Sequence, residues 1–163
     1  SLETIVPGIV AIGDVNGGPK FTHISYDDFR IITNNILHKK NTHTTGRLLP
    51  YVVFIDPQLG RIGLTEKKAK DLGYDYQVAK MPMSWVARAI ETGETAGLMK
   101  VLVDSSSKQI LGAAILGIEG GEIMAILQVA MMGKLPYTEL RDAIFAHPSI
   151  SEALNNLFEM LED

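Results

Sequence analysis

GLMKVLVDSSSKQILGAAIL, residues 97–116, is the stretch of sequence that decides the fold. Its two apolar runs, 97–103 and 109–116, are separated by the polar segment 104–108, and this spacing predicts an antiparallel β-hairpin. The other expected elements are strands before the hairpin at 51–55, 61–64 and 76–83, a short helix at 65–72, and helices after the hairpin at about 121–132, 137–143 and 149–161. Strands first and helices last favour an α+β fold, with helices packed on an antiparallel sheet, over a doubly wound parallel sheet.

The N-terminal part of the chain has a different pattern. Residues 8–14 form an apolar run that closes on Gly13-Asp14, which is typical of a buried strand ending in a turn. From Phe21, apolar residues recur at helical spacing as far as Ile36, and the polar stretch 38–46 then predicts a linker. We therefore expect two domains, 1–45 and 46–163.

Composition excludes several classes of function. The net charge of −4 offers no broad positive surface for nucleic acid or for an anionic membrane, and the longest apolar run, around 123–132, is too short to cross a bilayer. The N-terminus shows no signal segment, so a cytoplasmic protein is expected. The chain has no cysteine, which excludes a disulfide, a thiolate metal site or dithiol chemistry within it. His38 and His43 lie in the polar linker with no further ligands, so no metal site is expected.

The predicted helix at 121–132 is apolar around nearly its whole circumference. A surface helix of a monomer would have one polar, solvent-exposed face. One side of this helix is therefore expected to meet the sheet and the other side to meet a second subunit, which predicts a homodimer. The alternative is a helix buried in the centre of a single protomer.

The segment His147-Pro148-Ser149-Ile150-Ser151-Glu152 is the most informative for chemistry. Ser149 and Glu152 have the spacing of a capping box, so a helix should begin here and the preceding histidine should be rigidly placed. If Glu152 accepts a hydrogen bond from one ring nitrogen of His147, the other nitrogen is available as a general acid-base. The alternative is that Glu152 only caps the helix and His147 is an ordinary, partly buried residue.

The Gly13-Asp14 turn also has two interpretations. An acidic residue at the end of a buried strand commonly binds a cofactor hydroxyl, and the start of the next helix offers a positive dipole end to an electron-rich group. Alternatively, Asp14 is simply a turn residue and Thr22 the N-cap of the helix.

Taken in order along the chain, these segments resemble the glutathione reductase, lipoamide dehydrogenase and mercuric reductase family of flavin-dependent pyridine nucleotide-disulfide oxidoreductases. The resemblance covers nearly the whole chain, from about Ile5 to Leu161. The matching segments are Val10–Val15 with Thr22-His23, Pro50–Phe54 with Asp56-Pro57, Ile62–Glu66, Arg88–Lys100, and His147-Pro148-Ser149 with Glu152.

The resemblance implies a role for each matching residue. Gly13 and Asp14 would contact FAD, with Asp14 hydrogen-bonded to the ribityl chain. The helix start at Thr22 and His23 would face the flavin's pyrimidine edge. His147, oriented by Glu152, would be the acid-base for a redox thiol in the other subunit. The His147–Pro148 bond is usually cis in this family, which the sequence alone does not decide.

Three features of the family are missing from the sequence: the Cys-x-x-x-x-Cys pair, the G-x-G-x-x-G motif and the nicotinamide-binding domain. We therefore expect the C-terminal part of an FAD-dependent NAD(P)H oxidoreductase with a small-molecule or disulfide substrate: a remnant of the FAD domain followed by the dimerisation domain. This part is expected neither to bind FAD tightly nor to turn over alone. The 154–158 tail favours the mercuric reductase-like and reactive-chlorine-resistance branches, although no Cys-Cys follows to bind mercuric ion. The alternative is a free-standing dimerisation module without enzymatic activity.

Overall fold

The computed structural model describes residues 2–161 of the chain. The chain forms two compact units, which divide between Leu49 and Pro50. Sequence analysis placed the boundary between residues 45 and 46.

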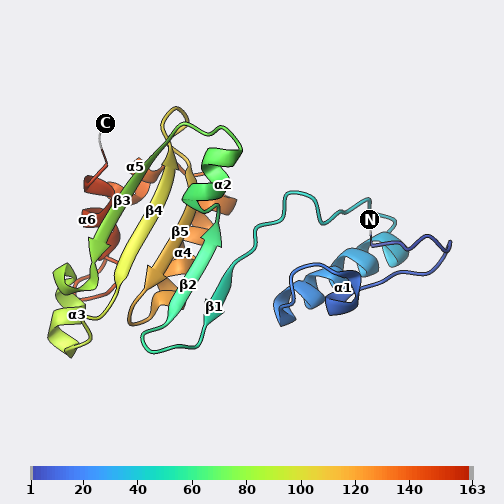
Figure 1. Ribbon diagram of the computed structural model, residues 1–163, viewed down its shortest axis with the longest axis horizontal. Coiled ribbons are helices and arrows are strands. Elements are labelled where there is room, and N and C mark those ends of the chain that lie inside the picture. Colours follow the sequence, from blue (N-terminus) through green and yellow to red (C-terminus); the bar gives the residue numbers. More distant parts are fainter. Residues whose placement is uncertain (1, 162–163) are drawn as a thin grey trace. The chain divides into compact units, whose positions relative to one another are not determined.

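The C-terminal unit is built on a five-stranded antiparallel sheet with the strand order β1-β2-β5-β4-β3 (Figure 1). The predicted hairpin is confirmed as its centre: β4 and β5 pair antiparallel, with Lys100 opposite Ala114 and a register shift between Leu102 and Val103. The strands are β1 (Tyr51–Val53), β2 (Leu59–Gly63), β3 (Tyr76–Pro82), β4 (Leu98–Asp104) and β5 (Ile110–Leu116).

The three C-terminal helices cover one face of this sheet and lie behind it in Figure 1. α4 (Gly120–Met132) packs on β2 and β5, α6 (Ala153–Glu159) on β3, and α5 (Tyr137–Arg141) on α6. The predicted α+β class is therefore confirmed. α5 and α6 are shorter than expected: the first turn before α6 is closed by tighter i to i+3 bonds, such as Ala153 N–H to the Ile150 carbonyl at 3.2 Å.

Strand alternation separates the two faces of the sheet. The helix-covered face carries the completely buried side chains of Ile62, Val101 and Ile115. Lys80 and Lys100 are neighbours on the other face, where both form ion pairs with Glu66 of α2 (Glu66–Asp71). Most of the core therefore lies on the helix-covered side, although Leu102, on the same face as Lys100, is buried as well.

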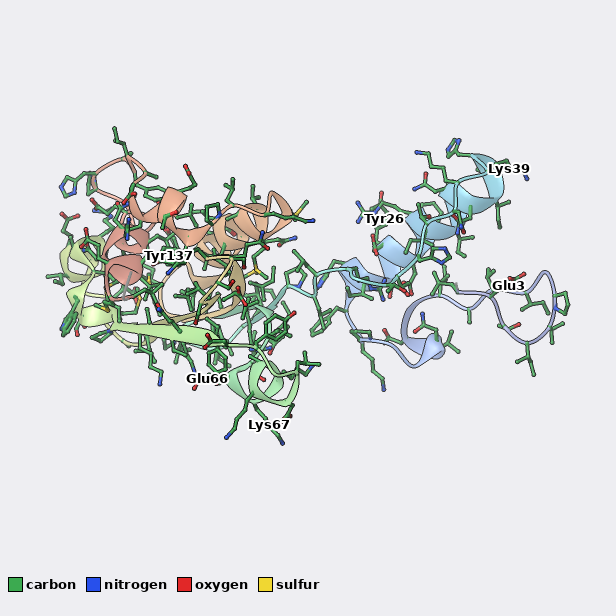
Figure 2. The ribbon with its side chains drawn as sticks, turned by 90° about the horizontal axis from the view of Figure 1, so that it is seen from above. Glu3, Tyr26, Lys39, Glu66, Lys67 and Tyr137 are labelled. Atoms are coloured by element: carbon green, nitrogen blue, oxygen red, sulfur yellow. The ribbon has the colours of Figure 1, made fainter. Side chains whose placement is uncertain are left out.

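Close contact between α4 and the sheet depends on Gly60. A Cβ atom added there would lie 2.2 Å from the carbonyl oxygen of Gly120, in the first turn of α4. Further along, Tyr137, labelled in Figure 2, lies at the start of α5 and is fully buried. Its ring stacks on Phe158 of α6, with ring centroids 5.6 Å apart. This stacking packs α5 against α6, and α6 in turn contacts β3.

Two short helices lie outside this layer. α2 begins as predicted, with the Thr65 side chain accepting a hydrogen bond from the Lys68 N–H at 3.0 Å. The other is α3 (Ala87–Thr92), which follows a 3-10 turn η2 (Met83–Trp85) at the end of β3.

The N-terminal unit corrects two predictions. Residues 8–14 do not form a buried strand: residues 8–10 are exposed, and Val10 makes only an isolated bridge with Glu3 before the chain enters the 3-10 turn η1 (Gly13–Asn16). A buried strand needs partners for its backbone groups. In the described part of this unit, residues 2–4 pair with one edge of the run, and the Ile9 N–H bonds within a turn to the Val6 carbonyl. The helix α1 (Thr22–Leu37) is present, but Phe21, not Thr22, occupies its N-cap position.

The buried side of α1 also differs from the predicted stripe. Phe29 and Ile36 are about half exposed, and the residues turned inward are Ile24, Asp28 and Ile31. Apolar spacing could not identify this face because a carboxylate occupies its centre.

Candidate functional site

His147 lies in the segment that connects α5 to α6. Its Nδ1 atom is 3.1 Å from both carboxylate oxygens of Glu152, and the His147–Pro148 peptide bond is cis. The histidine side chain is 67% exposed, whereas that of Glu152 is only 24% exposed. The imidazole is therefore held on one side and open on the other, within the protomer.

Glu152 also makes the capping-box contacts. The Ser149 N–H donates to Glu152 Oε1 at 3.1 Å, and the Glu152 N–H donates to Ser149 Oγ at 3.3 Å. Sequence analysis left bracing and capping as alternatives, but in the structure one carboxylate makes both sets of contacts. The regular helix begins only at Ala153, one turn later than the capping box suggested.

The electrostatics favour an ionised Glu152. The backbone hydrogen bond from Ser149, followed by the contact with His147, holds the pKa of Glu152 below its ordinary value. A carboxylate on the Nδ1 side directs Nε2 outward and stabilises an imidazolium when it forms. This arrangement is chemically competent to accept and return a proton at Nε2.

A second set of contacts organises the Gly13–Asn16 segment, which contains two of the predicted cofactor residues. Gly13 has a φ of +70°, and a Cβ atom there would lie 2.9 Å from Ser25 Oγ, so only glycine fits without a shift. Its N–H donates to Asp28 Oδ2 at 3.0 Å, and Asn16 Nδ2 donates to the same oxygen at 2.8 Å. Asp14 itself lies on the exposed side of this turn.

Asp28 was missed by sequence analysis. Its side chain is completely buried, and its other oxygen accepts a hydrogen bond from Arg47 at 2.7 Å. Burial alone would raise the pKa of Asp28, but the hydrogen bonds from Arg47, Gly13 and Asn16 outweigh it and lower the pKa. The sequence indicated this contact only weakly, through one pair of aspartates in α1 and one arginine at the end of a polar linker.

The two remaining predicted cofactor residues, Thr22 and His23, are exposed in the first turn of α1. The His23 ring stacks on Phe21 with centroids 5.3 Å apart, and no side chain caps this end of the helix. The helix dipole gives this end of α1 a positive potential. A tight glycine turn, an exposed carboxylate and an uncapped helix start are compatible with a flavin.

The outer side of α4 carries an apolar stripe. Ala125, Val129 and Met132 recur at helical spacing and are exposed, with Val129 and Met132 each 66% accessible. Ile123 and Leu127, on the opposite side, are buried against the sheet. The helix is thus apolar on a face that the protomer does not cover.

Residues 2–161 contain neither a candidate metal site nor a candidate membrane-spanning helix. In this part of the chain, no three His, Cys, Asp or Glu side chains are grouped to hold a metal ion. None of the helices described combines the length and apolar character that a membrane span requires.

The fold agrees with comparisons to known proteins. Residues 49–158 match the pyridine nucleotide-disulphide oxidoreductase dimerisation domain, and the chain belongs to this family. The resemblance inferred from the sequence motifs is therefore confirmed.

Three relatives show how far the similarity extends. The probable pyridine nucleotide-disulfide oxidoreductase RclA of Escherichia coli (strain K12) is 41% identical over 162 residues, or 99% of this chain and 37% of that protein. The dihydrolipoyl dehydrogenase of Rhizobium etli is 36% identical, over 93% of this chain and 32% of that protein. A mercuric reductase of Staphylococcus aureus is 31% identical, over 94% of this chain and 28% of that protein. The chain spans roughly a third of the length of these relatives.

A solved structure extends this similarity to three dimensions. The HOCl-induced flavoprotein disulfide reductase RclA from Escherichia coli superposes with a TM-score of 0.92 at 41% identity, covering 99% of this chain and 37% of that one. The similarity therefore includes both units of the chain.

Proposed function

We propose that this chain is the C-terminal part of an FAD-dependent oxidoreductase that passes electrons from NAD(P)H to a small-molecule or disulfide acceptor. The observation that carries this proposal is the His147–Glu152 pair, in which Nδ1 is held by a carboxylate while the ring stays largely exposed. An imidazole held in this way is suited to a reacting group outside its own protomer. Its substrate would be a redox thiol of the partner subunit.

The proton chemistry follows from this geometry. His147 Nε2 accepts a proton from a thiol and later returns it, while ionised Glu152 fixes the tautomer and stabilises the intervening imidazolium. FAD, when bound, supplies two-electron transfer between the nicotinamide and the disulfide. Asp14, behind Gly13, would hold the flavin's ribityl chain, and the first turn of α1 at Thr22 and His23 would bind its electron-rich edge.

Dimerisation belongs to the same proposal. The exposed apolar stripe of α4, which includes Val129 and Met132, would pack against a second copy of the chain in a homodimer. Pairing would bring His147 to the partner's redox site, so that assembly and catalysis are linked. The 163-residue chain alone would dimerise without turnover, because flavin binding needs more of the protein than one turn and one helix start. A cytoplasmic location stays a prediction of the sequence.

The test is His147→Ala in the intact flavoenzyme that carries this chain. Loss of a general acid-base should slow acceptor reduction by about 10²–10⁴-fold while flavin reduction by NAD(P)H is unchanged. Stopped-flow absorbance separates the two half-reactions. Unimpaired acceptor reduction in this variant would refute the proposed role. A native protein of this length that dimerises and never binds flavin would instead identify a free-standing module.

A further inference from the structure

Asn155 contacts the beginning of the segment that carries His147. Its Nδ2 atom donates to three backbone carbonyl oxygens, those of Leu140 at 2.9 Å, Arg141 at 2.8 Å and Ala143 at 3.0 Å. The first two carbonyls belong to the last turn of α5. One side-chain amide thus serves acceptors that the end of a helix leaves without intrahelical partners.

These bonds determine where the chain leaves α5. α5 was predicted to run to residue 143, but it ends at Arg141, and carbonyls that could have continued the helix accept from Asn155 instead. The chain then extends through residues 142–146 toward His147. Its path therefore starts from a point that α6 holds.

α6 and the turn before it hold the histidine segment at both ends. Glu152 binds the imidazole and the Ser149 N–H at the far end, and Asn155, three residues later, binds the near end. Between them, the Ser149 hydroxyl donates to the Ala146 carbonyl at 2.6 Å. Without Asn155, the imidazole would keep its contact with Glu152, but the backbone that leads to His147 could shift.

We infer that Asn155 is a positioning residue for His147, which rests on the function proposed above. The chemistry requires a donor, because all three contacts are carbonyl oxygens. Asn155→Asp keeps the shape of the side chain and replaces the NH₂ group by an oxygen, which repels these carbonyls. Asn155→Gln keeps the donor on a longer side chain. Asn156, the next residue of α6, is exposed and supplies a matched control as Asn156→Asp.

The experiment compares these variants with the unmodified intact flavoenzyme. Displacement of a reacting group by about 1 Å can cost about 10²-fold in rate, so Asn155→Asp should lower kcat for acceptor reduction by at least about tenfold. The KM for NAD(P)H and the rate of flavin reduction should not change. Asn155→Gln should recover part of the loss, and Asn156→Asp should behave as the unmodified enzyme does. A merely structural role would lower thermal stability and flavin content without this split between half-reactions.

A second measurement does not depend on turnover. In the 163-residue chain, ¹⁵N relaxation of residues 142–147 should show increased mobility in Asn155→Asp and not in Asn156→Asp. If Asn155→Asp fails to fold, Asn155→Gln and Asn155→Ser are compared by the same two assays, and the loss should be larger for serine.

The outcomes separate this inference from the proposed function. If His147→Ala slows acceptor reduction but none of the Asn155 variants does, the positioning role is wrong and the proposed function stands. If His147→Ala has no effect, the proposed function fails. In that case, increased mobility of residues 142–147 would show only that Asn155 holds the segment, and the positioning role in catalysis would fall with the function.

Discussion

Replacing Gly60 by alanine should separate α4 from the sheet. The new Cβ atom would lie 2.2 Å from the Gly120 carbonyl oxygen and 2.8 Å from Met124 Cβ, inside the 3.0 Å that real Cβ atoms keep. α4 would have to move outward by roughly 0.8 Å, the difference between 2.2 and 3.0 Å. The obstacle is backbone and cannot rotate away.

The expected loss in free energy of unfolding can be compared with that of other overpacked cores. Added methyl groups in a packed core typically cost about 1–3 kcal/mol, and a backbone obstacle places Gly60→Ala at the upper end, about 3 kcal/mol. For a domain of this size, such a loss lowers Tm by about 10 °C or more. Movement of α4 would also loosen the contacts of Ile62 and Leu127, which are fully buried at this interface.

Gly133→Ala provides the control. Gly133 has right-handed helical angles, φ −76° and ψ −5°, and an added Cβ atom would meet nothing closer than 3.5 Å. Alanine there should be neutral or stabilise by about 0.4–1 kcal/mol.

Urea unfolding followed by fluorescence of the single tryptophan, Trp85, reports on the C-terminal unit. If Gly60→Ala lowered the free energy of unfolding by less than about 1 kcal/mol, or had the same effect on it as Gly133→Ala, the close packing of α4 on β2 would be refuted.

Two further predictions concern the histidine segment and the subunit interface. Because the pKa of Glu152 is lowered in the folded chain, its contribution to stability is complete above the ordinary value of 4.5 and is lost as pH falls through the lower folded value. The NMR chemical shift of the Ser149 amide should change with pH as Glu152 titrates, and this pH dependence should disappear in Glu152→Gln. A Ser149 shift with the same pH dependence in Glu152→Gln would contradict the contact. Val129→Asp should place a charge in the proposed α4 interface and convert the proposed dimer to a monomer, as measured by light scattering, whereas Lys67→Asp on α2 (Figure 2) should leave the mass unchanged. A dimer that tolerates Val129→Asp would place the interface elsewhere.

Local sequence was sufficient for much of the histidine site. The capping-box spacing of Ser149 and Glu152 acts within one helical turn, so the contacts that hold His147 could be anticipated from residues within five positions of one another. Asn155 could not, because its acceptors lie 12 to 15 positions earlier, in the last turn of α5 and just after it. No pattern of residue types marks such a contact.

The same distinction holds for the fold. Hydrophobic periodicity and turn residues are local properties, and they determined the β4–β5 hairpin, the class of the fold and the apolar character of α4. The burial of Asp28 was decided only by tertiary structure, because Arg47, Gly13 and Asn16 supply its partners from outside α1. Tertiary structure likewise decided against a buried strand at residues 8–14, since an apolar run becomes a strand only where another segment satisfies its backbone.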